Sequence, residues 1–279
     1  MQNSINLTPH LYNYGIDELA YYDQGKGEQT ILLIHGFGED HAIWKNQIEF
    51  LSTHYRVIAP NLPGVHCKPL ALHHSQAPNI RMYVEVLHEL MHHLHIEQYY
   101  IVGHSMGGYI GLSFADYYVN HVQGLLLFHS TTYEDNEAKK TSRMKVAEFI
   151  QEWGVSKYLE TATPNLFGDA FKKANPAAIQ NVIDSGLGIS PEAMIQFVFA
   201  MRNRKAMTHL LQQHTIPVWM IAGEADLAVT IQDSLEQIKL LPSSNSLVLK
   251  EVGHMGMLEA TDLVNQFIKK MLVGDKDAL

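Results

Sequence analysis

The strongest chemical pattern in the chain is a serine set between glycines, in the run Gly103-His104-Ser105-Met106-Gly107. A serine hydroxyl is a weak nucleophile at neutral pH, so it needs exposure, a base within hydrogen-bond reach and donors that stabilise the oxyanion it creates. The apolar run before Ser105 predicts a strand and the periodic pattern after it predicts a helix, which is the setting of a nucleophile elbow. Glycine on both sides avoids a clash in so sharp a turn. We therefore expect Ser105 to be a nucleophile, with the backbone N–H of Met106 at the helix N-terminus as one oxyanion donor.

Short apolar runs are the elements that must position this serine. They occupy residues 30–34, 55–59, 98–102, 124–128, 216–222 and 246–250, with helical patterns between several of them. Apolar runs that alternate with helices are typical of parallel strands covered on both faces by crossover helices. The pattern predicts an α/β fold with a doubly wound, mostly parallel sheet. An alternating segment at residues 18–24 is expected to form a hairpin leading into the strand at 30–34.

About 87 residues between the runs at 124–128 and 216–222 contain no convincing strand. They hold amphipathic segments near residues 138–153, 176–185 and 191–212. A stretch of this length inside one domain must carry its own structure, so it predicts a helical cap inserted in the sheet. The expected division is a core of residues 1–130 and 213–279 and a cap of residues 131–212.

From the strand near Ile31 to the helix near Phe267, the sequence resembles the α/β-hydrolase superfamily, in its serine-nucleophile, cap-bearing, esterase-like form. The run His35-Gly36-Phe37-Gly38 matches the family's His-Gly-x-Gly loop, which implies that the backbone N–H of Phe37 is the second oxyanion donor. The family order of nucleophile, acid and histidine places Asp226, in a Gly-x-x-Asp turn, as the acid and His254, in a Gly-His turn, as the base.

Alternatives remain for the acid and the base. Glu224 is a second candidate acid, and Glu134 and Asp135 are further candidates, since some relatives recruit the acid after the 124–128 strand. His35 and His104 are near the site in sequence, but the family commonly has histidine at both places without using it as the base. The chain departs from the family in the loop at residues 61–68, which puts contacts inferred from that loop in doubt. A serine nucleophile argues against haloalkane dehalogenase and epoxide hydrolase chemistry.

Composition and charge argue against several classes of binding partner. The 279 residues carry a formal charge of −9, which gives no basic surface for nucleic acid, and no stretch is long and apolar enough to insert in a membrane. The N-terminal segment has no export-signal pattern, and the single Cys67 cannot form an internal disulfide, so we expect a cytoplasmic protein. The histidines at 88, 92, 93 and 95 lack an HExxH pattern, and Gly36-Phe37-Gly38 lacks the third glycine of a dinucleotide site. No metal and no cofactor are expected.

The sequence thus predicts a serine hydrolase that forms an acyl-enzyme on a small to medium carboxylic ester or related acyl compound. The same scaffold leaves open carbon–carbon bond, thioester or lactone hydrolysis, acyl transfer and cofactor-free peroxidation, and, in another class, a non-catalytic receptor. Substrate choice is expected to lie among apolar cap residues, although some of these must pack the cap's own helices. They are Phe149, Trp153, Tyr158, Leu166, Phe167, Phe171, Met194, Phe197, Phe199, Met201 and Met207. Oligomeric state is not predicted.

Overall fold

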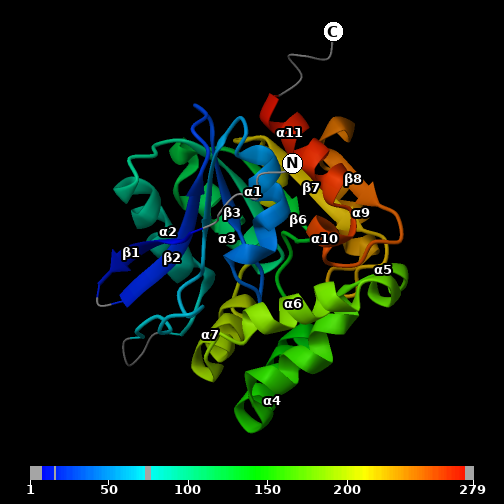
Figure 1. Ribbon diagram of the computed structural model, residues 1–279. Helices are drawn as coiled ribbons and strands as arrows, with labels where there is room; N and C mark the ends of the chain where they lie inside the picture. The colour runs from blue at the N-terminus through cyan, green and yellow to red at the C-terminus, as the bar shows by residue number, and fades with distance from the viewer. Residues whose placement is uncertain (1–7, 16, 73–76, 274–279) are drawn as a thin grey trace.

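Eight strands form one sheet in the order β1-β2-β4-β3-β5-β6-β7-β8 in the computed structural model, which describes residues 8–15, 17–72 and 77–273 (Figure 1). The strands are β1 (His10–Tyr14), β2 (Asp17–Gln24), β3 (Thr30–Ile34), β4 (Arg56–Pro60), β5 (Tyr99–His104), β6 (Val122–Phe128), β7 (Val218–Gly223) and β8 (Ser246–Leu249). Strands β3 to β8 pair in parallel, whereas β1 and β2 are antiparallel to their neighbours. The predicted mostly parallel α/β sheet is confirmed, and each predicted apolar run overlaps a strand.

The predicted hairpin between residues 18–24 and 30–34 is wrong. β2 pairs with β1 and with β4, and β4 lies between β2 and β3 in the sheet. The physical reason lies in the connection, because Gly25 and Gly27 press against the backbone just before β4. A Cβ at either glycine would come within 2.0 Å of a carbonyl oxygen, of Tyr55 and His54 respectively. The chain therefore crosses the end of β4 instead of turning back on itself.

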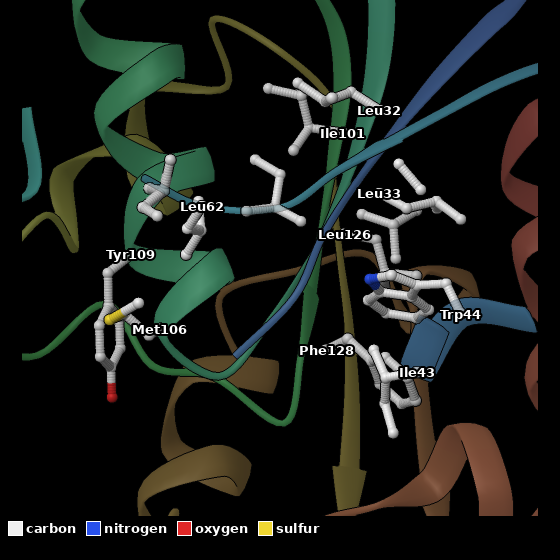
Figure 2. Close-up of a cluster of buried hydrophobic side chains, with 14 of the residues drawn as sticks. Leu32, Leu33, Ile43, Trp44, Leu62, Ile101, Met106, Tyr109, Leu126 and Phe128 are labelled. Atoms are coloured by element: carbon white, nitrogen blue, oxygen red, sulfur yellow. The ribbon is translucent and has the colours of Figure 1, made fainter. Parts of the chain in front are cut away.

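Helices cover both faces of the sheet. On one face α1 (Lys45–Leu51) packs against α11 (Thr261–Val273), and on the other α2 (Ile80–His93) packs against α3 (Met106–Tyr117). Figure 2 shows the strands between Met106 and Tyr109 of α3 on one side and Ile43 and Trp44, which precede α1, on the other. Burial on both faces is why these strands read as continuous apolar runs. The sheet-bearing part also contains α9 (Ile231–Ile238) and α10 (Gly256–Glu259).

Five helices lie between β6 and β7. They are α4 (Glu137–Ala162), α5 (Asp169–Ala174), α6 (Pro176–Gly186), α7 (Pro191–Arg202) and α8 (His209–Gln213). Figure 1 shows α4, α6 and α7 together at the bottom of the view, and α4 contacts both of the others. Helix α4 bends at Gly154, which has φ 82°. The exact division into core and cap stays a prediction. None of the helices in residues 8–273 that the structure describes is long and apolar enough to cross a bilayer.

Candidate active site

Ser105 lies in the sharp turn between β5 and α3, with φ 50° and ψ −112°. The turn is fixed by the Ser105 N–H, which donates to the Phe128 carbonyl at 2.9 Å, and by Ser130 Oγ, which donates to the Ser105 carbonyl at 2.8 Å. A Cβ on Gly107 would lie 2.2 Å from the Ile34 carbonyl oxygen, so only glycine fits there. The predicted strand, turn and helix around Ser105 are therefore present.

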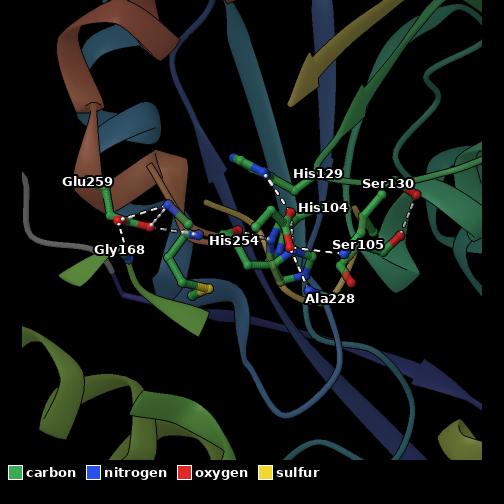
Figure 3. A network of polar contacts seen from close by, with 12 residues as sticks. His104, Ser105, His129, Ser130, Gly168, Ala228, His254 and Glu259 are labelled. Carbon is green, nitrogen blue, oxygen red and sulfur yellow. Dashed lines mark hydrogen bonds and ion pairs between the residues drawn. The ribbon is translucent and has the colours of Figure 1, made fainter. Parts of the chain in front are cut away.

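His254 and Asp226 form a buried pair, with His254 Nδ1 donating to Asp226 Oδ2 at 2.7 Å (Figure 3). The other oxygen of Asp226 accepts the N–H groups of Ala228 at 2.8 Å and Val229 at 2.9 Å, which fixes the carboxylate plane. Burial alone would lower the pKa of His254, but the Asp226 carboxylate outweighs it and the pKa is raised. Burial alone would raise the pKa of Asp226, but the two imidazoles beside it, His254 foremost, lower it. Asp226 is therefore ionised whenever His254 works as a base.

The second of those imidazoles belongs to His129, whose Nδ1 lies 3.2 Å from Asp226 Oδ2. His129 follows β6 at φ 48°, and burial lowers its pKa to about 4, partly offset by Asp226, so it is neutral at pH 7. No sequence motif marks this residue, and only its place at the carboxyl end of a buried strand pointed to the site. His129 shares the carboxylate with His254 and limits how Asp226 can rotate.

The ligand atoms of His129, Asp226 and His254 lie within 4.8 Å of one another, which makes them a geometric candidate for a metal site. A tetrahedral ion about 2.0–2.1 Å from each ligand would hold the ligand atoms about 3.3 Å apart. The 2.7 Å between His254 and Asp226 is too short for that spacing and fits a shared proton. The cluster is better described as a hydrogen-bonded network than as a metal centre.

His104 and His35 have structural partners. His104 Nδ1 pairs with the buried Glu39 at 3.0 Å, and His104 Nε2 donates to the His254 carbonyl at 2.9 Å. Glu39 also accepts the Gly36 N–H at 2.8 Å, so it ties the loop after β3 to the histidine turn. His35 Nε2 accepts the Leu62 N–H at 2.9 Å, and burial lowers the pKa of His35. Both ring nitrogens of His104 and of His35 are thus engaged, His35 Nδ1 by the Gly36 carbonyl, so neither imidazole has a nitrogen free to take a proton from Ser105. Glu39 is a residue that sequence reasoning missed.

The alternative acids lie elsewhere. Glu224 is exposed and accepts the Glu251 N–H at 3.1 Å, and Glu134 is also exposed. Asp135 is buried but forms ion pairs with two arginines, Arg143 and Arg204. Asp226 is thus the one of the four candidates that the structure pairs with His254.

Ser105 and His254 line one cavity of about 300 Å³. Phe37 lines it as well, and Met106 is the first residue of α3, directly after Ser105. In the described part of the chain, neither the Phe37 nor the Met106 backbone N–H donates to another backbone group outside the helices and strands. The Ser105 hydroxyl makes no hydrogen bond to another described residue, and such bonds are often long in unliganded enzymes and tighten with substrate. The structure therefore brings Ser105, His254 and Asp226 into one site with Phe37 at its wall.

Helix α4 forms much of the cavity wall. Its lining residues are Lys139, Ser142, Arg143, Val146, Tyr158, Leu159 and Ala162. Of the apolar cap residues expected to choose the substrate, Tyr158, Leu166 and Met201 line this cavity, whereas Phe197 is fully buried. Arg143 had no sequence signal, because an arginine on an amphipathic helix is ordinarily a solvated side chain.

A family model described as alpha/beta hydrolase fold matches residues 29–177, which is more than half of the chain. The chain belongs to the α/β-hydrolase fold family. The resemblance inferred from the sequence motifs is thereby confirmed.

Relatives of this α/β hydrolase are similar at low identity. It is 25% identical over 277 residues to the (E)-2-((N-methylformamido)methylene)succinate hydrolase of Acinetobacter baylyi, with 98% of this chain and 97% of the relative covered. It is 27% identical over 254 residues to the dihydrolipoyllysine-residue acetyltransferase component of the acetoin cleaving system of Pseudomonas putida, where it spans 63% of the relative's length. The malate-bound structure of a thermophilic esterase from Thermogutta terrifontis superposes with a TM-score of 0.86 at 26% identity, over 95% of this chain and 98% of that one.

Proposed function

We propose that this α/β hydrolase is a serine hydrolase that cleaves small to medium carboxylic esters or related acyl compounds through an acyl-enzyme on Ser105. The observation that carries the proposal is that Ser105 and His254 line the same cavity while Asp226 holds the His254 ring at 2.7 Å. A relative named as a hydrolase and a similar structure of an esterase support the same reaction class.

In the proposed mechanism His254 Nε2 takes the proton of Ser105 as Oγ attacks the acyl carbon. Asp226 keeps the other proton of His254 on Nδ1 and stabilises the imidazolium. The N–H groups of Phe37 and Met106 bind the oxyanion of the tetrahedral intermediate. His254 then protonates the leaving group, and a water activated by the same imidazole attacks the acyl-enzyme and frees Ser105.

The cavity volume of about 300 Å³ lies at the lower end of the usual range for small-molecule sites, which favours a small substrate. A small-molecule partner, a cytoplasmic location and independence from nucleic acid and membranes remain predictions of the same proposal.

The test compares Ser105→Ala with Ser142→Ala, which removes another serine hydroxyl from the wall of the same cavity. Ser105→Ala is expected to lower kcat for 4-nitrophenyl esters by about 10⁴-fold or more, as loss of a nucleophile does in other serine hydrolases. Ser142→Ala should keep the activity and its labelling by a fluorophosphonate probe. Full ester hydrolysis by Ser105→Ala would refute the assignment, and product analysis with an added alcohol separates acyl transfer from hydrolysis.

A further inference from the structure

Arg143 is a cation in the wall of the Ser105 cavity that the proposed mechanism does not use. Its side chain is 25% exposed, and Nε donates to Asp135 Oδ2 at 3.1 Å. For the part of the chain that the structure describes, its terminal nitrogens Nη1 and Nη2 donate to no protein acceptor. A guanidinium offers its donors in a planar fork that matches a carboxylate, so the free nitrogens can bind an anion.

The positive charge of Arg143 is not neutralised by Asp135, because Arg204 already neutralises that carboxylate. Arg204 Nη2 lies 2.8 Å from Asp135 Oδ1, and its guanidinium stacks 4.0 Å above the Tyr109 ring. Arg204 also donates to the carbonyls of Met201 and Tyr133. Two arginines against one carboxylate leave one positive charge, and only Arg143 lines the cavity.

Neighbouring groups on α4 suit the same kind of ligand. Tyr158 lines the cavity, and its pKa is raised by burial although Arg143 opposes the shift, so its hydroxyl keeps its proton and can donate. Its ring lies 5.8 Å from the ring of Phe37, which joins this wall to the predicted oxyanion site. Lys139 also lines the cavity and lies 3.8 Å from Asp233.

Three carboxylates lie at or behind the cavity wall. Asp135 is matched by the two arginines, whereas Glu39 and Asp226 contact histidines, which hold the pKa values of both carboxyl groups low against the upward effect of burial. A second carboxylate on a substrate is repelled by Glu39 and Asp226 and attracted by the unmatched charge of Arg143. These charges favour one orientation of a charged substrate.

We propose that the substrate carries a carboxylate remote from the bond that is cleaved, and that the terminal nitrogens of Arg143 bind it. This inference rests on the proposed serine-hydrolase function and names its substrate class: half-esters of dicarboxylic acids or close analogues. Arg143 is then a specificity-determining residue, and the catalytic groups stay those of the Ser105 site.

The test uses pairs of 4-nitrophenyl esters that differ only in charge, the mono-esters of adipic, pimelic and suberic acids and their methyl-capped counterparts. Shorter diacids are avoided because their half-esters cleave themselves through cyclic anhydrides. Wild-type enzyme is expected to favour the acidic member at one chain length through a lower KM. Arg143→Gln should lower kcat/KM for that ester by about 10- to 100-fold, the value of hydrogen bonds to a charged group, and leave the methyl-capped ester within about 2-fold.

Lys145→Gln is the matched control, because it removes the same charge from an exposed position of α4 outside the cavity. Arg143→Lys should recover part of the selectivity, and added salt should raise KM for the acidic ester only. Equal use of both esters by wild type, or an equal loss on both in Arg143→Gln, overturns the inference and leaves the serine mechanism standing. If no ester is cleaved, the proposed function fails instead, and calorimetric binding of suberate to wild type and Arg143→Gln still decides the anion site.

Discussion

Ser105 has a backbone conformation, φ 50° and ψ −112°, that side-chain-bearing residues rarely adopt. A side-chain-bearing residue in this conformation lowers the free energy of unfolding by about 1–3 kcal/mol. Glycine avoids this strain, but its greater conformational entropy in the unfolded chain offsets about 0.4–1 kcal/mol of the gain. Ser105→Gly is therefore expected to be about 1 kcal/mol more stable than Ser105→Ala, although the proposed mechanism expects neither variant to be active. The Ser105 hydroxyl has no hydrogen-bond partner among the described residues, so its loss is common to both variants and cancels in the comparison.

Calorimetric unfolding of the two variants measures this difference. An entropy of unfolding of about 2 cal/mol/K per residue turns 1 kcal/mol into a Tm difference of about 2 °C for a chain of this length. Ser156, exposed on α4, supplies a control of opposite sign: Ser156→Gly should be about 1 kcal/mol less stable than Ser156→Ala. A Ser105→Gly variant that melts at or below Ser105→Ala refutes the idea that strain is stored at Ser105.

Three further outcomes are expected. Only neutral His254 can take a proton, and its pKa is raised. The acid limb of the pH profile of kcat/KM should therefore have its midpoint above about pH 6.5, the ordinary pKa of histidine. A midpoint below that pH contradicts the pairing of His254 with Asp226. Glu259 accepts the N–H groups of Gly168, Gly253 and Met255 around His254, so Glu259→Gln should lower kcat about 10- to 100-fold in ester assays, with secondary structure by circular dichroism unchanged. Gly107→Ala, whose Cβ would lie 2.2 Å from a backbone oxygen, should cost about 3 kcal/mol in denaturant unfolding, whereas Gly111→Ala, whose Cβ meets only the side chains of Leu125 and Ile101, should cost about 1 kcal/mol.

Local sequence chemistry was sufficient for the turn at Ser105 and for the parallel strands. A buried strand needs a continuous apolar run, and the elbow needs glycines at fixed places, so both leave a pattern in adjacent residues. The pairing of β2 left none, because strand order depends on where Gly25 and Gly27 meet the backbone before β4, more than twenty residues away. The hairpin was wrongly predicted for this reason.

The site residues that sequence reasoning missed act through partners distant in the chain. Glu39 contacts His104, and His129 contacts Asp226, 97 positions further along. Their value comes from burial and from the neighbour that the fold supplies. Arg143 is the extreme case, since its residue type on α4 is ordinary and only the cavity and its surplus charge distinguish it.

The bent helix α4 forms one wall of the cavity, and loops at the ends of strands supply Ser105, Asp226 and His254. Groups that would select a substrate and groups that would react with it thus occupy separate stretches of chain, and the two meet where Tyr158 contacts Phe37. Mutation of one helix can then redirect the enzyme to a new compound at little risk to the reaction itself. For directed evolution, residues 139–162 are therefore the segment to randomise first. The same separation gives a physical reason why one scaffold serves relatives with such different names.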